Sequence, residues 1–197
     1  MIREAVEDDF STIAAITNHY ILTTSIHFAY EPLSPEAIRA TWTHGRDRYP
    51  WVVADEAGVA DDARVVGYAK AGVWRDRAAY RWTAEIGLYV ADAARGRGLG
   101  RALYTALLAE LTRRGFRSVI AGITLPNDPS IGLHRAFDFV SVGTVRDAGY
   151  KLGAWHDIEF WQKRLATDAA PPRAGGPPQG GPSPQGDADP CFAADRR

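Results

Sequence analysis

The pattern of apolar and polar residues predicts a helix near the start of the chain. Between residues 7 and 22 the apolar side chains recur every three or four positions, at Phe10, Ile13, Ile16 and Tyr20. This spacing is typical of an amphipathic helix with one buried face. A preceding run, residues 1–6, has the length and composition of a short strand.

The rest of the body alternates between further helices and strands. "SPEA" at Ser34 predicts a helix start, with serine as N-cap and proline at the first helical position. Helices are also expected over residues 98–114 and 128–138, the latter with Asp128 as N-cap and Pro129 in the first turn. Strands are expected over residues 51–55, 64–74, 81–90, 116–125, 139–149 and 155–165. Without strict βαβ alternation, this order predicts an α/β (α+β) fold: a mixed, mostly antiparallel central sheet with helices on both faces.

Composition changes sharply near the C-terminus. Residues 166–197 hold seven of the 12 prolines and almost no large apolar side chains. Such a Pro/Gly-rich segment cannot bury enough surface to offset its ordering entropy, so we expect a disordered tail. A proline-rich docking arm is the alternative. The folded domain is expected to span residues 1–165.

Charge and cysteine content narrow the class of protein. The net charge is −1, which favours neither nucleic acid nor an anionic membrane as partner. The chain contains no run of 18 apolar residues and starts with an acidic segment unlike a signal peptide, so a cytoplasmic protein is expected. The single cysteine, Cys191, lies in the tail, which leaves the expected domain without a disulfide or a thiolate nucleophile. The spacing of His19, His44 and His156 indicates no metal site.

A glycine-rich, cationic turn stands directly before the helix expected over residues 98–114. It reads "ARGRGLGRALYTALLAEL", with guanidinium groups at Arg95, Arg97 and Arg101. Free N–H groups of a glycine turn and a helix start form an anion cradle, and arginines suit phosphate oxygens. The P-loop pattern and the Rossmann fingerprint do not match this turn. A pyrophosphate site is therefore indicated, and a solvated basic loop is the alternative.

Taken with other segments, "RGRGLG" resembles the acetyl-CoA pyrophosphate motif of the GNAT acetyltransferase family. The segments "LPNDPS" and "GYKLGAWHD" resemble its phosphinothricin acetyltransferase branch, and the resemblance covers about residues 2–165. It implies the GNAT fold with six to seven strands, acetyl-CoA as cosubstrate, and no metal. The cofactor contacts that it implies are Leu88, Tyr89, Val90, Arg95, Gly96, Arg97, Gly98, Leu99, Gly100, Arg101, Asn127, Ser130 and His134.

Glu85, in "WTAEIGLYV", is the candidate general base. Direct attack of an amine on a thioester needs a group that accepts a proton. Burial beside aromatic side chains raises the pKa of a carboxyl group toward neutrality. Spacing alone favours a solvent-facing glutamate on an edge strand, whereas the resemblance implies that Glu85 is catalytic and that Leu88, Tyr89 and Val90 offer backbone groups to the cofactor.

His134 and Asn127 are further candidates that the resemblance indicates. His134 would protonate the leaving thiolate or only hydrogen-bond the cofactor, and a core or surface histidine is the alternative. Asn127 looks like the cofactor-contacting asparagine of the family, although an ordinary turn asparagine fits as well. Where the family usually has Gly-Phe, this chain has Asp138 and Phe139, for which we expect a modest cost in stability.

The acceptor side is predicted from segments that resemble the substrate loops of the branch. Arg75, Arg77 and Lys151 would bind the anionic groups of an amino acid, and Phe28, Trp74 and Tyr80 would form pocket walls. Exposed surface charges are the alternative for the arginines.

These residues together predict an N-acetyltransferase that acts on a small amino acid or analogue, of the phosphinothricin or methionine sulfoximine/sulfone type. The alternatives are an acetyltransferase for protein N-termini or other amines, and a non-catalytic acetyl-CoA sensor. We expect a homodimer with no nucleic-acid or membrane partner.

Overall fold

The computed structural model describes residues 1–56 and 65–165. The tail expected at residues 166–197 lies outside the described residues, as does most of the turn before residue 65. Seven strands form one sheet in the order β1-β2-β3-β4-β5-β7-β6. They are β1 (Ile2–Glu4), β2 (Trp51–Asp55), β3 (Val65–Val73), β4 (Thr83–Val90), β5 (Ser118–Thr124), β6 (Val140–Lys151) and β7 (Ala154–Arg164). The pair β4–β5 is parallel and the other neighbouring pairs are antiparallel, which confirms the expected mixed sheet.

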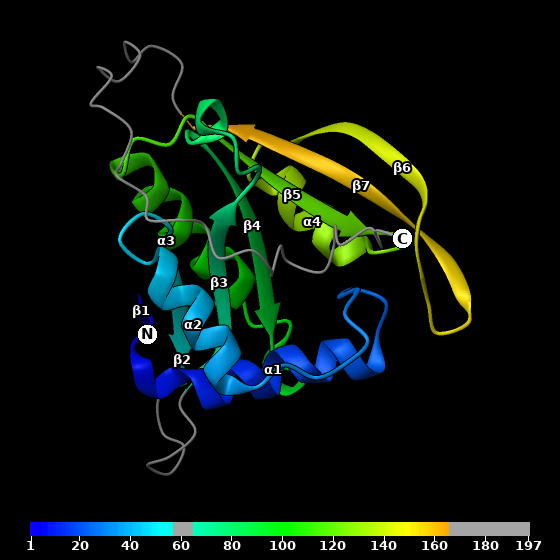
Figure 1. Ribbon diagram of the computed structural model, residues 1–197, viewed down its shortest axis with the longest axis horizontal. Helices are drawn as coiled ribbons and strands as arrows, with labels where there is room; N and C mark the ends of the chain where they lie inside the picture. Colours follow the sequence, from blue (N-terminus) through cyan, green and yellow to red (C-terminus); the bar gives the residue numbers. More distant parts are fainter. Residues whose placement is uncertain (57–64, 166–197) are drawn as a thin grey trace.

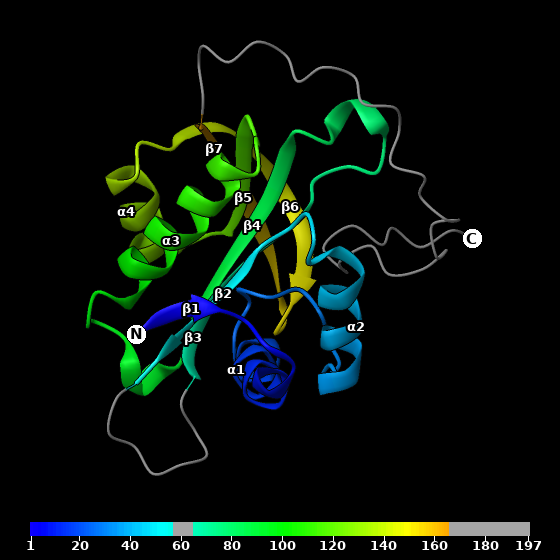
Figure 2. The ribbon, with the colours of Figure 1, turned by 90° about the vertical axis from the view of Figure 1, so that its left-hand side faces the viewer.

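Two pairs of helices cover the two faces of this sheet (Figures 1 and 2). One pair is α1 (Phe10–Thr23) and α2 (Pro35–Gly45); the other is α3 (Leu99–Arg113) and α4 (Asp128–Ala136). Short 3-10 turns occur at η1 (Glu7–Asp9), η2 (Ala78–Tyr80) and η3 (Asp92–Ala94). Figure 2 shows the sheet between the two pairs, with α1 and α2 on one side and α3 and α4 on the other.

Each face of the sheet has its own hydrophobic core, because side chains on a strand alternate between faces. On one face, Leu103 and Leu107 of α3 pack with Ala84 and Ile86 of β4. On the other face, α1 and α2 pack on Trp51 of β2 and Tyr68 of β3 through their own apolar side chains, Phe10, Ile13, Ile38 and Trp42. Glu85, Gly87 and Tyr89 alternate with Ala84 and Ile86, so they face the α1/α2 side.

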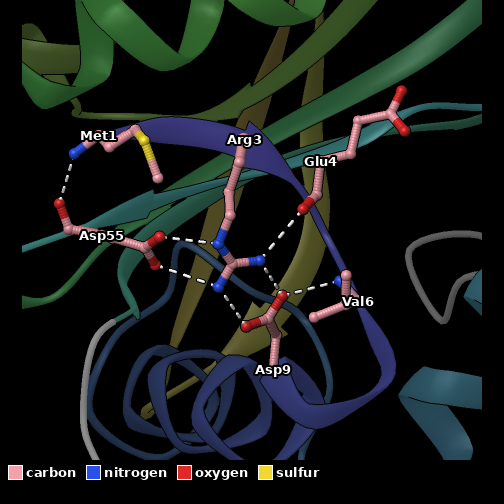
Figure 3. A network of polar contacts seen from close by, with 6 residues as sticks. All are labelled: Met1, Arg3, Glu4, Val6, Asp9 and Asp55. Atoms are coloured by element: carbon pink, nitrogen blue, oxygen red, sulfur yellow. Dashed lines mark hydrogen bonds and ion pairs between the residues drawn. The ribbon is translucent and has the colours of Figure 1, made fainter. Parts of the chain in front are cut away.

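An arginine ties the N-terminal strand to the start of α1 (Figure 3). Arg3 donates to both carboxylate oxygens of Asp9, at 2.8 and 2.7 Å, and its Nε donates to Asp55 at 2.7 Å. Asp9 also accepts from the backbone N–H of Val6 at 2.8 Å. These carboxylates raise the pKa of Arg3, with the hydrogen bond to Asp9 as the largest cause. The network fixes β1 against β2 and sets where α1 begins.

Helix boundaries follow the expected capping chemistry, with one correction. Ser34 accepts from the N–H of Ala37 at 3.1 Å, which confirms it as the N-cap of α2. The prediction of Asp128 as N-cap of α4 was wrong: Asn127 caps this helix, and its Oδ1 accepts from the N–H of Ser130 at 3.3 Å. Asp128 is the first helical residue. Among the described helices, none is long and apolar enough to span a membrane.

Candidate functional site

The parallel strands β4 and β5 separate partway along their length. Their register pairs only Thr83, Ala84 and Glu85 with residues 118–120, although β4 continues to Val90 and β5 to Thr124. The two strands therefore leave a gap in the sheet that begins directly after Glu85.

Backbone groups of β4 face this gap at alternate residues. The N–H of Ala91 donates to Val66 on the β3 side at 2.8 Å, so strand alternation directs the N–H and C=O of Val90, Leu88 and Ile86 toward the gap. The backbone groups of Tyr89 point to β3, so this geometry does not support the expectation that Tyr89 offers them to a cofactor. The carbonyl of Val90 accepts from the hydroxyl of Tyr20 at 2.7 Å, whereas its N–H faces the gap together with the backbone groups of Leu88 and Ile86.

The glycine turn lies between the end of β4 and the start of α3. Gly96 and Gly98 both have left-handed backbones, with φ of 76° and 78°, and a Cβ built on either would meet no described atom within 4 Å. Gly98 is the N-cap of α3 and has no side chain to occupy the first N–H groups of the helix. The turn thus presents backbone donors to open space, as an anion site requires.

The predicted arginines of this turn are exposed and differ in their contacts. Arg95 lies 2.6 Å from Asp92 and donates to the hydroxyl of Tyr20 at 2.9 Å. Arg97 pairs with Glu56, and the guanidinium of Arg101 lies over the ring of Phe137. Because Tyr20 bonds both Arg95 and the carbonyl of Val90, it links the turn to the end of β4. The sequence pattern had placed Tyr20 in the buried face of a helix and gave no sign of this second role.

Glu85 stands at the mouth of the gap, at the last residue of β4 that pairs with β5. It is half-buried and faces the α1/α2 side, opposite Gly72 of β3. A Cβ built on Gly72 would meet no described atom within 4 Å, so open space lies beside Glu85 on this face. A carboxylate in this place can reach a molecule that approaches the gap from the α1/α2 side.

His134 is the buried residue of α4, and both of its ring nitrogens form hydrogen bonds within the protein. Nδ1 lies 2.7 Å from the carbonyl of Ser130, which requires a proton on Nδ1. Nε2 then accepts from the hydroxyl of Tyr104 at 2.9 Å. Burial lowers the pKa of His134 and raises the pKa of Tyr104. The neutral imidazole therefore joins α4 to α3.

Lys151 and Phe28 meet where the β6–β7 hairpin contacts the loop after α1. The Lys151 ammonium is buried and donates to the carbonyls of Ile21, at 2.5 Å, and His27. Burial lowers the pKa of Lys151. The Phe28 ring lies against the backbone of Gly149. Lys151 thus holds the loop that carries Phe28, and the expected role of its ammonium in substrate binding is not supported by this geometry.

The remaining acceptor candidates lie on the segment between β3 and β4. The half-buried Trp74 packs edge-on against Phe160, with ring centroids 5.6 Å apart. Arg75 is exposed, and its guanidinium lies over the ring of Trp74 at 5.2 Å. Arg77 and Tyr80 are also exposed; Arg77 is the N-cap of η2 and Tyr80 is its last residue. The structure therefore brings Trp74 and Arg75 together.

Metal chemistry finds no support in the described part of the chain. Residues 1–56 and 65–165 contain no group of three or more His, Cys, Asp or Glu side chains that could hold a metal ion.

A glycine–arginine turn before a helix, beside the opening of a sheet, is typical of a site for a phosphate-bearing ligand. The acetyltransferase (GNAT) family model matches residues 13–139, and the chain belongs to this family.

Similar proteins extend the match beyond the family model. The phosphinothricin N-acetyltransferase of Streptomyces viridochromogenes is 45% identical over 172 residues, which cover 87% of this chain and 91% of that protein. The L-methionine sulfoximine/L-methionine sulfone acetyltransferase of Salmonella typhimurium is 36% identical, with 86% and 97% covered. A solved structure of the yncA acetyltransferase of Salmonella typhimurium, with its cofactor acetyl-CoA, gives a TM-score of 0.81 at 35% identity and covers 87% and 96% of the two chains.

Proposed function

We propose that this chain transfers the acetyl group of acetyl-CoA to the free amine of a small amino acid or analogue, of the phosphinothricin or methionine sulfoximine/sulfone type. The observation that carries the proposal is the position of Glu85 at the mouth of a gap that leads to the glycine turn. The names of the similar proteins support this acceptor class.

Acetyl-CoA fits the residues present and supplies an activated acetyl group as a thioester. The N–H groups at the start of α3, together with Gly96, Gly98 and the nearby arginines, would hold its pyrophosphate. Backbone groups of Leu88 and Ile86 would bind its arm in the gap, because strand alternation directs them there. A backbone N–H in this place can also stabilise negative charge that develops on the acyl oxygen.

Glu85 would remove one proton from the ammonium of the acceptor, which frees the nitrogen lone pair for attack on the acyl carbon. The N–C bond then forms as the C–S bond breaks, and the electron pair leaves with sulfur. The attacking nitrogen then loses a second proton and the thiolate takes one up, so that the products are the N-acetylated acceptor and free CoA. His134 has both nitrogens engaged, so we infer that it orients α4 against α3 and does not itself donate the final proton. Asn127 and Ser130, joined by the N-cap bond, would shape the start of α4 beside the cofactor.

On the acceptor side, Trp74 and Phe28 would form walls, with Arg75, Arg77 and Tyr80 at the exposed rim. Lys151 would act as a positioning residue, since its ammonium fixes the loop that carries Phe28. This division places Trp74 and Phe28 at the walls of the pocket and the two arginines at its rim.

We also propose that the protein is a cytoplasmic homodimer. Strand β6 is an outer edge of the sheet, and Val140, Val142 and Val145 on it are 61%, 53% and 49% exposed. A row of exposed valines on an edge strand is a surface that a second copy can cover. Sedimentation equilibrium measures the oligomeric state directly.

The test of the proposed function is an acceptor screen that follows the release of free CoA. Phosphinothricin and methionine sulfone should each release CoA, whereas peptides with free N-termini should not. Release with peptides alone would favour an N-terminal acetyltransferase, and acetyl-CoA binding without release on any acceptor would favour a non-catalytic sensor.

A further inference from the structure

A lysine that the sequence motifs did not single out lies beside the candidate base. Lys70 of β3 pairs with Gly87 of β4, two residues from the pair between Gly72 and Glu85. Lys70 and Glu85 are therefore diagonal neighbours on the same face of the sheet. Long side chains at such positions reach one another.

Contacts on both sides hold the Lys70 side chain over the sheet. A Cβ built on Gly87 would lie 3.7 Å from Cε and 3.9 Å from Cγ of Lys70, so the lysine runs across this glycine. On the other side, the ammonium lies 5.4 Å from the ring centroid of the buried Trp51. Lys70 is half-buried, and its charge is thus kept near the sheet.

The ammonium of Lys70 and the carboxylate of Glu85 are complementary to the two charges of a free amino acid. At neutral pH an α-amino acid carries an ammonium and a carboxylate on one carbon. Open space lies beside Glu85 over Gly72, where such a molecule could enter. A half-buried ammonium beside this space attracts the carboxylate of such a molecule, because opposite charges interact more strongly away from bulk water.

We propose that Lys70 binds the α-carboxylate of the acceptor while Glu85 accepts a proton from its ammonium. This inference rests on the proposed function and narrows it to free α-amino acids. In the absence of an acceptor, we expect the Lys70 ammonium and the Glu85 carboxylate to pair with one another across the diagonal. A peptide N-terminus has no α-carboxylate on its first residue, so the pair selects against it.

The test compares two acceptors that differ in one charge, methionine sulfone and its carboxamide. Lys70→Met should raise KM for methionine sulfone by at least tenfold, which corresponds to about 1.4 kcal/mol. It should leave KM for the carboxamide within twofold of the parent. Lys70→Arg keeps the charge and should restore most of the lost affinity for methionine sulfone.

Lys163→Met is the matched control. Lys163 lies on β7, with its ammonium 3.7 Å from Asp138, and its loss should change neither KM. Acetyl-CoA affinity, measured by calorimetry, should be equal in the parent and in both Lys70 variants. Should Lys70→Met fail to fold, the parent must still show a KM for the carboxamide at least tenfold above that for methionine sulfone.

Two results would overturn the inference while leaving the proposed function intact: equal increases in KM for both acceptors, or no increase for either. A parent enzyme that releases no CoA with any acceptor would instead contradict the proposed function itself.

Discussion

Replacing Gly149 with alanine should destabilise the contact between the β6–β7 hairpin and the loop after α1. A Cβ on Gly149 would lie 2.6 Å from Cδ2 and 3.0 Å from Cζ of Phe28, and closer still to Cε2. Real Cβ atoms do not approach a ring so closely, so the ring or the hairpin must move. The two segments are also joined by the Lys151 ammonium and by the hydroxyl of Tyr30, which donates to the carbonyl of Tyr150.

The size of the effect follows from overpacking. Inserting a methyl group into a packed contact costs about 1–3 kcal/mol. In a domain of this length, that corresponds to a loss of about 2–12 °C in Tm. Because Phe28 is a proposed wall of the acceptor pocket, KM for the amino acid should rise as well, while the affinity for acetyl-CoA should not change.

Thermal melts of a double-mutant cycle measure the contact itself. Gly149→Ala should lower Tm in the parent but not in a Phe28→Ala background, where the ring is gone. Gly132→Ala is the matched control: a Cβ there meets no described atom within 4 Å, and alanine favours the helix, so Tm should stay or rise. An equal loss of Tm in both backgrounds, or no loss in the parent, would refute the reasoning.

Three further predictions concern the turn, the end of α4 and the buried histidine. Gly98→Val should weaken acetyl-CoA binding by at least tenfold in calorimetry, whereas Gly153→Val, at another open left-handed glycine, should bear similar strain and leave binding unchanged; equal binding in both variants would contradict the anion site. Asp138→Gly should raise Tm by about 2–4 °C, because Asp138 has a φ of 59° that costs a non-glycine residue about 1 kcal/mol; an unchanged Tm would show that the residue is unstrained. Burial lowers the pKa of His134, so near pH 6 the unfolded chain binds a proton more readily than the folded chain does, and stability should fall as the pH drops below about 6.5. In thermal melts from pH 7.5 to 5.5, Tm should fall less steeply with pH for His134→Gln than for the parent. Equal slopes of Tm against pH in the two proteins would contradict this prediction.

Much of the fold could be predicted because its elements follow local rules. The periodicity of Phe10, Ile13 and Ile16 reports a buried helix face, and the serine–proline start of α2 is set by residues next to one another. The cap of α4 was misassigned because asparagine and aspartate are both good N-caps and stand side by side at Asn127 and Asp128. Local rules do not decide between them.

The parts of the site that sequence could not predict depend on partners far apart in the chain. Lys151 reads as a free cation, yet its ammonium bonds carbonyls 130 and 124 residues away. The opening of the sheet after Glu85 depends on hydrogen-bond register, which side-chain patterns do not record. Lys70 lies two positions along its strand from the partner of Glu85, and only the pairing of β3 with β4 places the two side by side.

The most direct test of the proposed mechanism is the pH dependence of kcat for Glu85→Gln. Glutamine keeps the size of the side chain and its hydrogen bonding but accepts no proton. At neutral pH kcat should fall by about 10²–10⁴-fold, and much of the loss should be recovered at high pH, where the acceptor amine is already deprotonated. Acetyl-CoA affinity should not change. A variant that retains nearly the parent's kcat at neutral pH, on every acceptor that the parent uses, would contradict the role of Glu85 as the base.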